Sequence, residues 1–119
     1  MTQENKELLL KDLCARLPYD VKVLYNNKIY SIDYISGTYE EIKLDDSSTN
    51  YTLNISSVKP YLFPLSSMTE EQKKEWFYTL SSDYHITYDT VDWCNKNHFD
   101  YRGLIEKGLA IDATNLNIY

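Results

Sequence analysis

The densest group of side chains with chemical potential is the string His98-Phe99-Asp100-Tyr101-Arg102-Gly103. Free N–H groups at the start of a helix attract anions, and Arg and His add positive charge. The string therefore predicts an anion site formed by His98, Tyr101 and Arg102. The alternative is structural: Asp100 caps the following helix and occupies the same N–H groups, while Arg102 pairs locally. Because caps are far commoner than anion sites, the structural interpretation is favoured.

Metal and catalytic sites are less well supported by the residue types and their spacing. Cys94 and His98 stand four residues apart, which places two potential ligands on one helix face. A structural zinc site needs about four ligands, and only His85 and Cys14 remain to complete one. No phosphate-binding glycine motif and no catalytic triad signature is present. We therefore expect no metal, no cofactor and no enzymatic activity, with a small enzyme built around His98 and Asp100 as the alternative.

Tyrosine is the other conspicuous residue type, with 12 copies in the chain. Tyr favours strands, so ordinary sheet packing explains many of them, but Tyr and Trp also dominate binding surfaces. An acidic loop over residues 45–50 lies beside the tyrosines of the central segment. We expect any binding surface to lie here rather than on the C-terminal helices. Its candidate residues are Tyr30, Tyr34, Tyr39, Asp45, Asp46 and Tyr51.

These side chains must be positioned by an N-terminal helix and a set of short strands. Apolar residues at three- and four-residue spacing predict a helix that ends before Pro18. Its apolar stripe includes Cys14, whereas Asp12 and Arg16 fall on the remaining face. Alternating apolar residues then predict an antiparallel meander of four to five strands, with an SH3-like barrel as its curled alternative. Asn26-Asn27 suits a tight hairpin turn, and residues 58–63 suit an edge strand that tolerates Pro60.

The C-terminal half is predicted to hold two to three short helices, which makes the fold class α+β. Thr69 heads a capping box for the first helix, and Asp89 and Asp100 are candidate N-caps for the next two. Alternation over residues 84–88 suits a short strand between them. Gly108 fits the end of the last helix, with Leu109 placed to touch Leu104. The expected core residues are Leu10, Leu13, Ile32, Leu53, Trp76, Trp93, Leu104 and Ile105.

Length and charge exclude several classes of protein. The 119 residues suit one domain over residues 1–119, and 18 Asp and Glu against 12 Lys and Arg give a net charge of −6. Direct nucleic-acid binding needs cations facing phosphates, which this balance disfavours. No run approaches the ~18 apolar residues of a membrane span, and residues 1–6 lack the basic start of a secretory signal. We expect a cytoplasmic protein without membrane contact, in which Cys14 and Cys94 are buried thiols.

Three strings resemble a known family: KDLCARLPYDVKV over residues 11–23, VKPYLFPLSSMTEE over residues 58–71 and VDWCNKNHFDYRGLIEKGLA over residues 91–110. Together they are similar to a family of small proteins found in phages, prophages and conjugative elements of gut bacteria. The resemblance covers both ends of the chain and leaves out residues 24–57. It implies a mobile-element origin and carries over no functional residue.

The leading functional hypothesis is a small non-enzymatic binding protein acting inside the host bacterial cell. A fixed frame around a changeable middle suits a protein that follows a changing partner. Negative charge steers a protein towards basic surfaces, so the expected partner is a host protein with a basic surface, or else a small signalling molecule. The remaining alternatives are the small enzyme and a virion or assembly component that forms symmetric oligomers.

Overall fold

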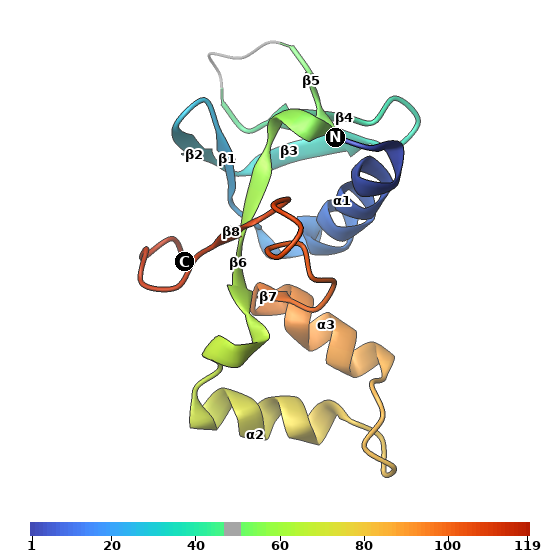
Figure 1. Ribbon diagram of the computed structural model, residues 1–119, viewed down its shortest axis with the longest axis vertical. Coiled ribbons are helices and arrows are strands. Elements are labelled where there is room, and N and C mark those ends of the chain that lie inside the picture. The colour runs from blue at the N-terminus through green and yellow to red at the C-terminus, as the bar shows by residue number, and fades with distance from the viewer. Residues whose placement is uncertain (47–50) are drawn as a thin grey trace.

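The computed structural model describes residues 1–46 and 51–119. Helix α1 (Gln3–Arg16) and two small sheets form a body, and helices α2 (Glu70–Thr79) and α3 (Tyr88–Lys96) form a separate layer at one end of the long axis (Figure 1). The long axis measures 47 Å against 30 and 24 Å for the other two. The α+β class predicted from the sequence is therefore confirmed.

Helix α1 ends before Pro18, as the sequence predicts, but it buries a different set of residues. Thr2 caps it by accepting a hydrogen bond from the Asn5 N–H at 3.1 Å, and Pro18 converts its end into a 3-10 turn over Leu17–Tyr19. The buried side contains Asp12 and Arg16, both 0% exposed, whereas Cys14 is exposed. The predicted solvent face and the predicted burial of Cys14 were therefore wrong. The buried positions do keep helical spacing, but two of them are charged and so escape a search for apolar stripes.

Two antiparallel units replace the single predicted meander. Strands β1 (Val23–Tyr25) and β2 (Lys28–Tyr30) form the expected hairpin, in which Asn26 and Asn27 adopt φ values of 50° and 62°. Strands β3 (Ile32–Ser36), β4 (Glu41–Leu44) and β5 (Leu53–Asn54) form a separate three-stranded sheet. Among the described residues the strands form no closed barrel, so the SH3-like arrangement is not observed.

Strand β6 (Lys59–Pro64) is the centre of the larger sheet and not an edge, which corrects the sequence prediction. It pairs antiparallel with β1 and parallel with β7 (Phe99–Asp100) and β8 (Ile111–Asp112). The N–H groups of Tyr61 and Phe63 donate to Lys22 and His98, whereas pairing with β8 involves only Tyr61 and Leu62. Pro60 and Pro64 lie opposite Val23 and Asp100, but the N–H groups that bond towards those neighbours belong to Tyr61 and Phe63. The missing N–H groups of the two prolines therefore cost no ladder bond.

The C-terminal elements follow the predicted caps only in part. Thr69 and Gln72 form the expected capping box of α2, whereas α3 is capped by Thr87 and not by Asp89. Residues 84–88 form no strand. The segment after Asp100 is a turn and not a helix, although its end has the predicted hydrogen bonds. Gly108 donates to Ile105 at 3.1 Å and Leu109 donates to Leu104 at 2.9 Å, with Gly108 at φ 73°.

The main core lies between α1, the two sheets and the turn after Asp100. Leu13 and Leu104 are fully buried as predicted, and Leu10, Ile32, Leu53 and Ile105 pack against the core while half-buried. Trp76 and Trp93 are also half-buried but lie on α2 and α3. Among the described residues, none between positions 65 and 99 belongs to this main core. The α2 and α3 layer therefore lies outside this core and contacts the body through α3, where Trp93 stacks on Phe99.

Candidate functional site

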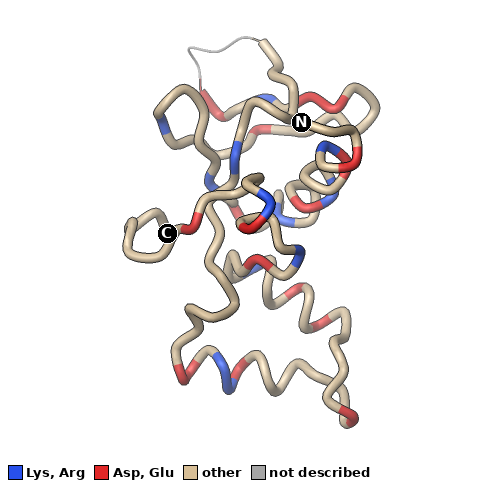
Figure 2. The backbone as a smooth tube through the Cα atoms, viewed as in Figure 1, with Lys and Arg blue, Asp and Glu red and all other residues tan. Residues whose placement is uncertain are grey.

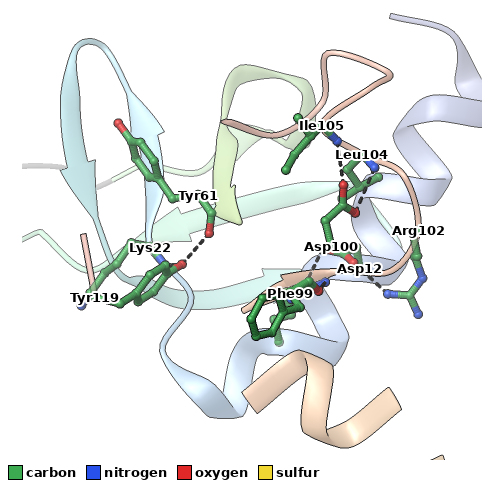
Figure 3. A network of polar contacts seen from close by, with 10 residues as sticks. Asp12, Lys22, Tyr61, Phe99, Asp100, Arg102, Leu104, Ile105 and Tyr119 are labelled. Carbon is green, nitrogen blue, oxygen red and sulfur yellow. Dashed lines mark hydrogen bonds and ion pairs between the residues drawn. The ribbon is translucent and has the colours of Figure 1, made fainter. Parts of the chain in front are cut away.

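A buried ionic network lies beneath the His98–Gly103 string. Asp12 receives Nε of Arg16 at 2.8 Å on one carboxylate oxygen and Nη1 of Arg102 at 2.9 Å on the other. Arg16 also donates through Nη2 to the carbonyl of Phe99 at 2.7 Å. Figure 3 shows Arg102, in the turn after β7, pointing towards Asp12 on α1. Both guanidinium groups thus find their counter-charge in one carboxylate of α1.

The Asp100 carboxylate occupies the backbone N–H groups that an anion would need. Its two oxygens accept from the N–H groups of Leu104 at 3.0 Å and Ile105 at 2.9 Å (Figure 3). The guanidinium of Arg102 also lies 4.6 Å from the ring centre of Tyr101. The anion site at His98, Tyr101 and Arg102 stays a prediction. The guanidinium of Arg102 is paired with Asp12, and the N–H groups of the turn are paired with Asp100.

His98 is held in a sheltered stack. Its ring lies 3.6 Å from that of Tyr119, nearly parallel, and its backbone has a φ of 64°. Burial lowers the pKa of His98 to about 4. The positive charges of Arg16 and Lys22 also lower this pKa, and the negative charge of Asp20 opposes them by raising it. The imidazole is therefore neutral at pH 7 and adds no positive charge to an anion site.

Tyr119 fixes this stack to the central strand. Its hydroxyl donates to the carbonyl of Tyr61 at 2.7 Å and accepts from the N–H of Lys22 at 2.9 Å (Figure 3). Burial raises the pKa of Tyr119 to about 12, so this hydroxyl keeps its proton at neutral pH. The contacts of His98 and Tyr119 join the C-terminal segment to β6.

The cysteines show no sign of activation. Burial raises the pKa of Cys94 to about 11 and raises the pKa of Cys14 as well. A protonated thiol is a poor nucleophile and a poor metal ligand. Over residues 1–46 and 51–119, no group of three or more His, Cys, Asp or Glu side chains is arranged to hold a metal ion, and no helix could cross a membrane.

The tyrosines predicted for the sheet surface lie in three places. Tyr51 hydrogen-bonds Tyr25, which raises the pKa of Tyr25, and Tyr25 lies 6.3 Å from the ring of Tyr30. Tyr34 pairs with Lys43 on the solvent side of the three-stranded sheet, and Tyr39 lies in the β3–β4 turn. Tyr34, Tyr39 and Tyr51 are 48–73% exposed.

The acidic loop beside these tyrosines is described only at its start. Asp45 is exposed and Asp46 is half-buried, while residues 47–50 lie outside the described residues. The described part of the sheet surface therefore carries acidic and aromatic side chains together.

A denser aromatic surface covers the arm, defined as α2, α3 and their connection (residues 70–96). Phe77, Tyr78, Tyr84, Ile86 and Tyr88 are 50–95% exposed, and α2 has no fully buried residue. The rings of Phe77 and Tyr84 lie 5.4 Å apart. Large apolar side chains gathered in this way on a small protein mark interaction sites more often than scattered ones do.

Three hollows share lining residues: two of them lie on the arm, and the third lies between residues 64–66 and the turn after Asp100. The central pocket, of about 80 Å³, is lined by Trp76, Thr90 and Cys94. Its other four lining residues, which also line a neighbouring hollow, are Leu65, Ile86, Val91 and Tyr101. Ile86 and Val91 also line the next hollow, beside Tyr88. Leu65 and Tyr101 also line a third hollow that reaches Ile105 and Glu106. We call these three adjoining hollows the α3 groove, with Leu65, Trp76, Ile86, Val91, Cys94 and Tyr101 at its centre.

No protein-family model, no curated protein and no solved structure matches this chain significantly.

The arm surface was missed because its sequence resembles that of a buried element. The alternation of Tyr84, Ile86 and Tyr88 was interpreted as a strand, which would have buried one side of it. These residues instead form the exposed connection from α2 to α3. The polar, charged composition of α2 was the available signal, since a helix with so few apolar residues cannot be buried on both sides.

Proposed function

We propose that this chain is a small, acidic, non-enzymatic binding protein, encoded by a mobile element, that occupies a host protein with a basic surface in the bacterial cytoplasm. The proposal rests on the exposed aromatic side chains of the arm. Burying them against a partner would remove large apolar areas from water, at about 25 cal/mol per Å². The mobile-element origin is supported by the resemblance of residues 11–23, 58–71 and 91–110 to phage and prophage proteins.

Charge supports a basic partner. The net charge of −6 speeds association with positively charged surfaces and slows association with acidic ones. Figure 2 shows acidic positions distributed over both the body and the arm. The same charge opposes direct contact with nucleic acid, whose phosphates require cations.

The arrangement of His98 and Asp100 supports a binding role over the enzyme alternative. A general acid or base must reach a substrate proton. His98 is stacked on Tyr119, and both oxygens of Asp100 accept backbone N–H bonds. These two groups are engaged in holding β6, β7 and the following turn together.

The test begins with purification of the bound host protein and then measures association kinetics with three variants. Tyr78→Ser/Tyr88→Ser alters the arm, and Asp45→Lys/Asp46→Lys alters the predicted sheet surface. Leu116→Ser, which is 48% exposed on the C-terminal segment, is the control. We expect at least tenfold weaker binding for the arm variant and unchanged binding for the control.

The sheet variant separates the two surfaces. If the sheet also faces the partner, Asp45→Lys/Asp46→Lys slows association and weakens its salt dependence, with a stability change of about 0–1 kcal/mol. Equal binding of the arm variant, the sheet variant and the control to the captured protein contradicts the proposal. So does a solution mass that shows a closed symmetric oligomer with no host protein bound, which favours an assembly component.

A further inference from the structure

The size of the central pocket of the α3 groove restricts what can fill it. Its volume of about 80 Å³ is roughly half that of the ~150 Å³ cavity that accepts benzene in an engineered protein. Sites for free small molecules usually measure about 300–1,000 Å³. The central pocket therefore fits one aliphatic side chain of a larger ligand. The flanking hollows, of about 330 and 360 Å³, are wider and more open to solvent, so they can take that ligand's neighbouring side chains.

The length of the groove matches a short helix. Two of its three hollows lie along α3, whose nine residues span about 13 Å at ~1.5 Å per residue, and the third adjoins them over residues 64–66 and 100–106. An amphipathic helix presents apolar side chains at positions i, i+3 or i+4, and i+7, so two to three turns would place one side chain in each hollow. Trp76, Val91 and Cys94 provide the apolar walls for the central one.

Charge distinguishes a foreign helix from a second copy of this chain. Between Leu65 and Glu106, eight Asp and Glu residues stand against four Lys and Arg, a net charge of −4. Two copies joined through their grooves would bring two such segments together and repel each other. A helix with Lys or Arg beside its apolar residues would instead be attracted.

We infer that the α3 groove binds a short amphipathic helix from a partner protein, through apolar side chains flanked by basic residues. The inference deepens the proposed function, because it names the part of the partner that the arm recognises. Tyr101 supports a polar component: its hydroxyl is buried in the groove wall without a hydrogen-bond partner. A ligand group that reached this hydroxyl would satisfy it.

The test uses synthetic 12-residue helical peptides and a Trp93→Phe background. The chain has two Trp residues, so this background leaves Trp76, in the groove wall, as the only fluorescent tryptophan. The first peptide carries Leu at helical i, i+3, i+4 and i+7 positions with Lys elsewhere. The second has the same composition in scrambled order, and the third replaces every Lys by Glu.

We expect the Leu/Lys helix to change Trp76 fluorescence and to bind at least tenfold more tightly than either other peptide. Ile86→Ser should weaken this binding at least tenfold, and Leu116→Ser should leave it within twofold. Both substitutions remove an exposed aliphatic side chain, at 67% and 48% exposure, so both variants should keep the wild-type circular-dichroism spectrum.

Equal binding of the ordered and scrambled peptides would overturn the inference, because it would show attraction by charge alone. Unchanged binding by Ile86→Ser would overturn it as well. Failure of the proposed function is distinguishable: the peptides would then bind in the groove although no host protein is captured. If a host protein needs Tyr78 and Tyr88 while the Leu/Lys helix does not bind, the proposed function holds and the groove inference is wrong.

Discussion

Replacing Asp12 by Ala should be among the most destabilising single substitutions in this chain. Asp12 and Arg16 are both 0% exposed, and the Asp12 carboxylate is the ionic partner of Arg16 at 2.8 Å and of Arg102 at 2.9 Å. Removing it leaves the Arg16 guanidinium buried, with the Phe99 carbonyl as its remaining hydrogen-bond partner and the Tyr101 ring 5.4 Å away. One guanidinium nitrogen of Arg16 already has no partner. The charge would therefore be almost uncompensated.

The expected loss is about 3–5 kcal/mol, the usual cost of removing one partner of a buried ion pair. Domains of this size are stable by about 5–15 kcal/mol, so the variant would retain a fraction of its stability. With a urea dependence of about 1–3 kcal/mol per molar, the unfolding midpoint should fall by roughly 2 M. Urea titration followed by circular dichroism and by tryptophan fluorescence measures this shift.

Two further variants keep the result interpretable. Asp20→Asn removes the partner of Lys22 from a pair in which the Asp20 side chain is 65% exposed, and it should cost no more than about 1 kcal/mol. Asn also tolerates the φ of 53° at this position. If Asp12→Ala does not fold, Asp12→Asn should show an intermediate loss. A loss below about 1 kcal/mol for Asp12→Ala would refute the reasoning, since Arg16 would then have access to water.

Three other outcomes are expected. Burial lowers the pKa of His98 to about 4 from an ordinary 6.5, so the unfolded chain binds more protons than the folded chain between these pH values. The free energy of unfolding should therefore fall by about 1–2 kcal/mol as the pH drops from 6.5 to 4, after allowance for partial exposure. Urea titrations at each pH measure this fall, and His98→Asn should lack it. Trp93→Ala should cost about 3 kcal/mol of stability, because Trp93 stacks on the buried Phe99 at a ring distance of 5.4 Å. Tyr78→Ala, at an exposed site, should change stability by no more than about 0.5 kcal/mol. Equal losses in the two variants would show that Trp93 is not packed. Amide hydrogen exchange should be faster in α2 than in α1, because α2 has no fully buried residue, and equal protection would show that the arm and the body unfold together.

The sequence predicted local structure better than long-range pairing. The caps at Thr69, the Asn26-Asn27 turn and the bonds at Gly108 depend on a few adjacent residues, and all three were predicted. The central position of β6 depends on β7 and β8, which contribute two residues each and so carry almost no periodicity. Their pairing could not be predicted from alternation of apolar and polar residues.

The candidate surfaces show the same limit. The sequence places Asp12 on the polar face of the helix, because charged side chains are rarely fully buried unless they are paired. Its partners Arg16 and Arg102 lie four and ninety positions away, and the second cannot be found from helical spacing. The exposure of Tyr84, Ile86 and Tyr88 follows from the way α2 and α3 extend from the body, which no local pattern encodes (Figure 1). Charge, by contrast, is a property of composition, and the expectation of a basic partner needed no fold.

The central place of β6 has a consequence for the order in which the chain acquires its structure. Its register joins Pro60 to Val23, Phe63 to Phe99 and Tyr61 to Ile111, all of them distant in sequence. Pairings between distant segments slow folding, into the range of milliseconds to seconds for small domains rich in such contacts. During synthesis, β1 and β6 become available well before β7 and β8. The nascent chain must therefore hold an incompletely paired central strand until residues 99–112 have left the ribosome, and this interval is when it is most exposed to aggregation.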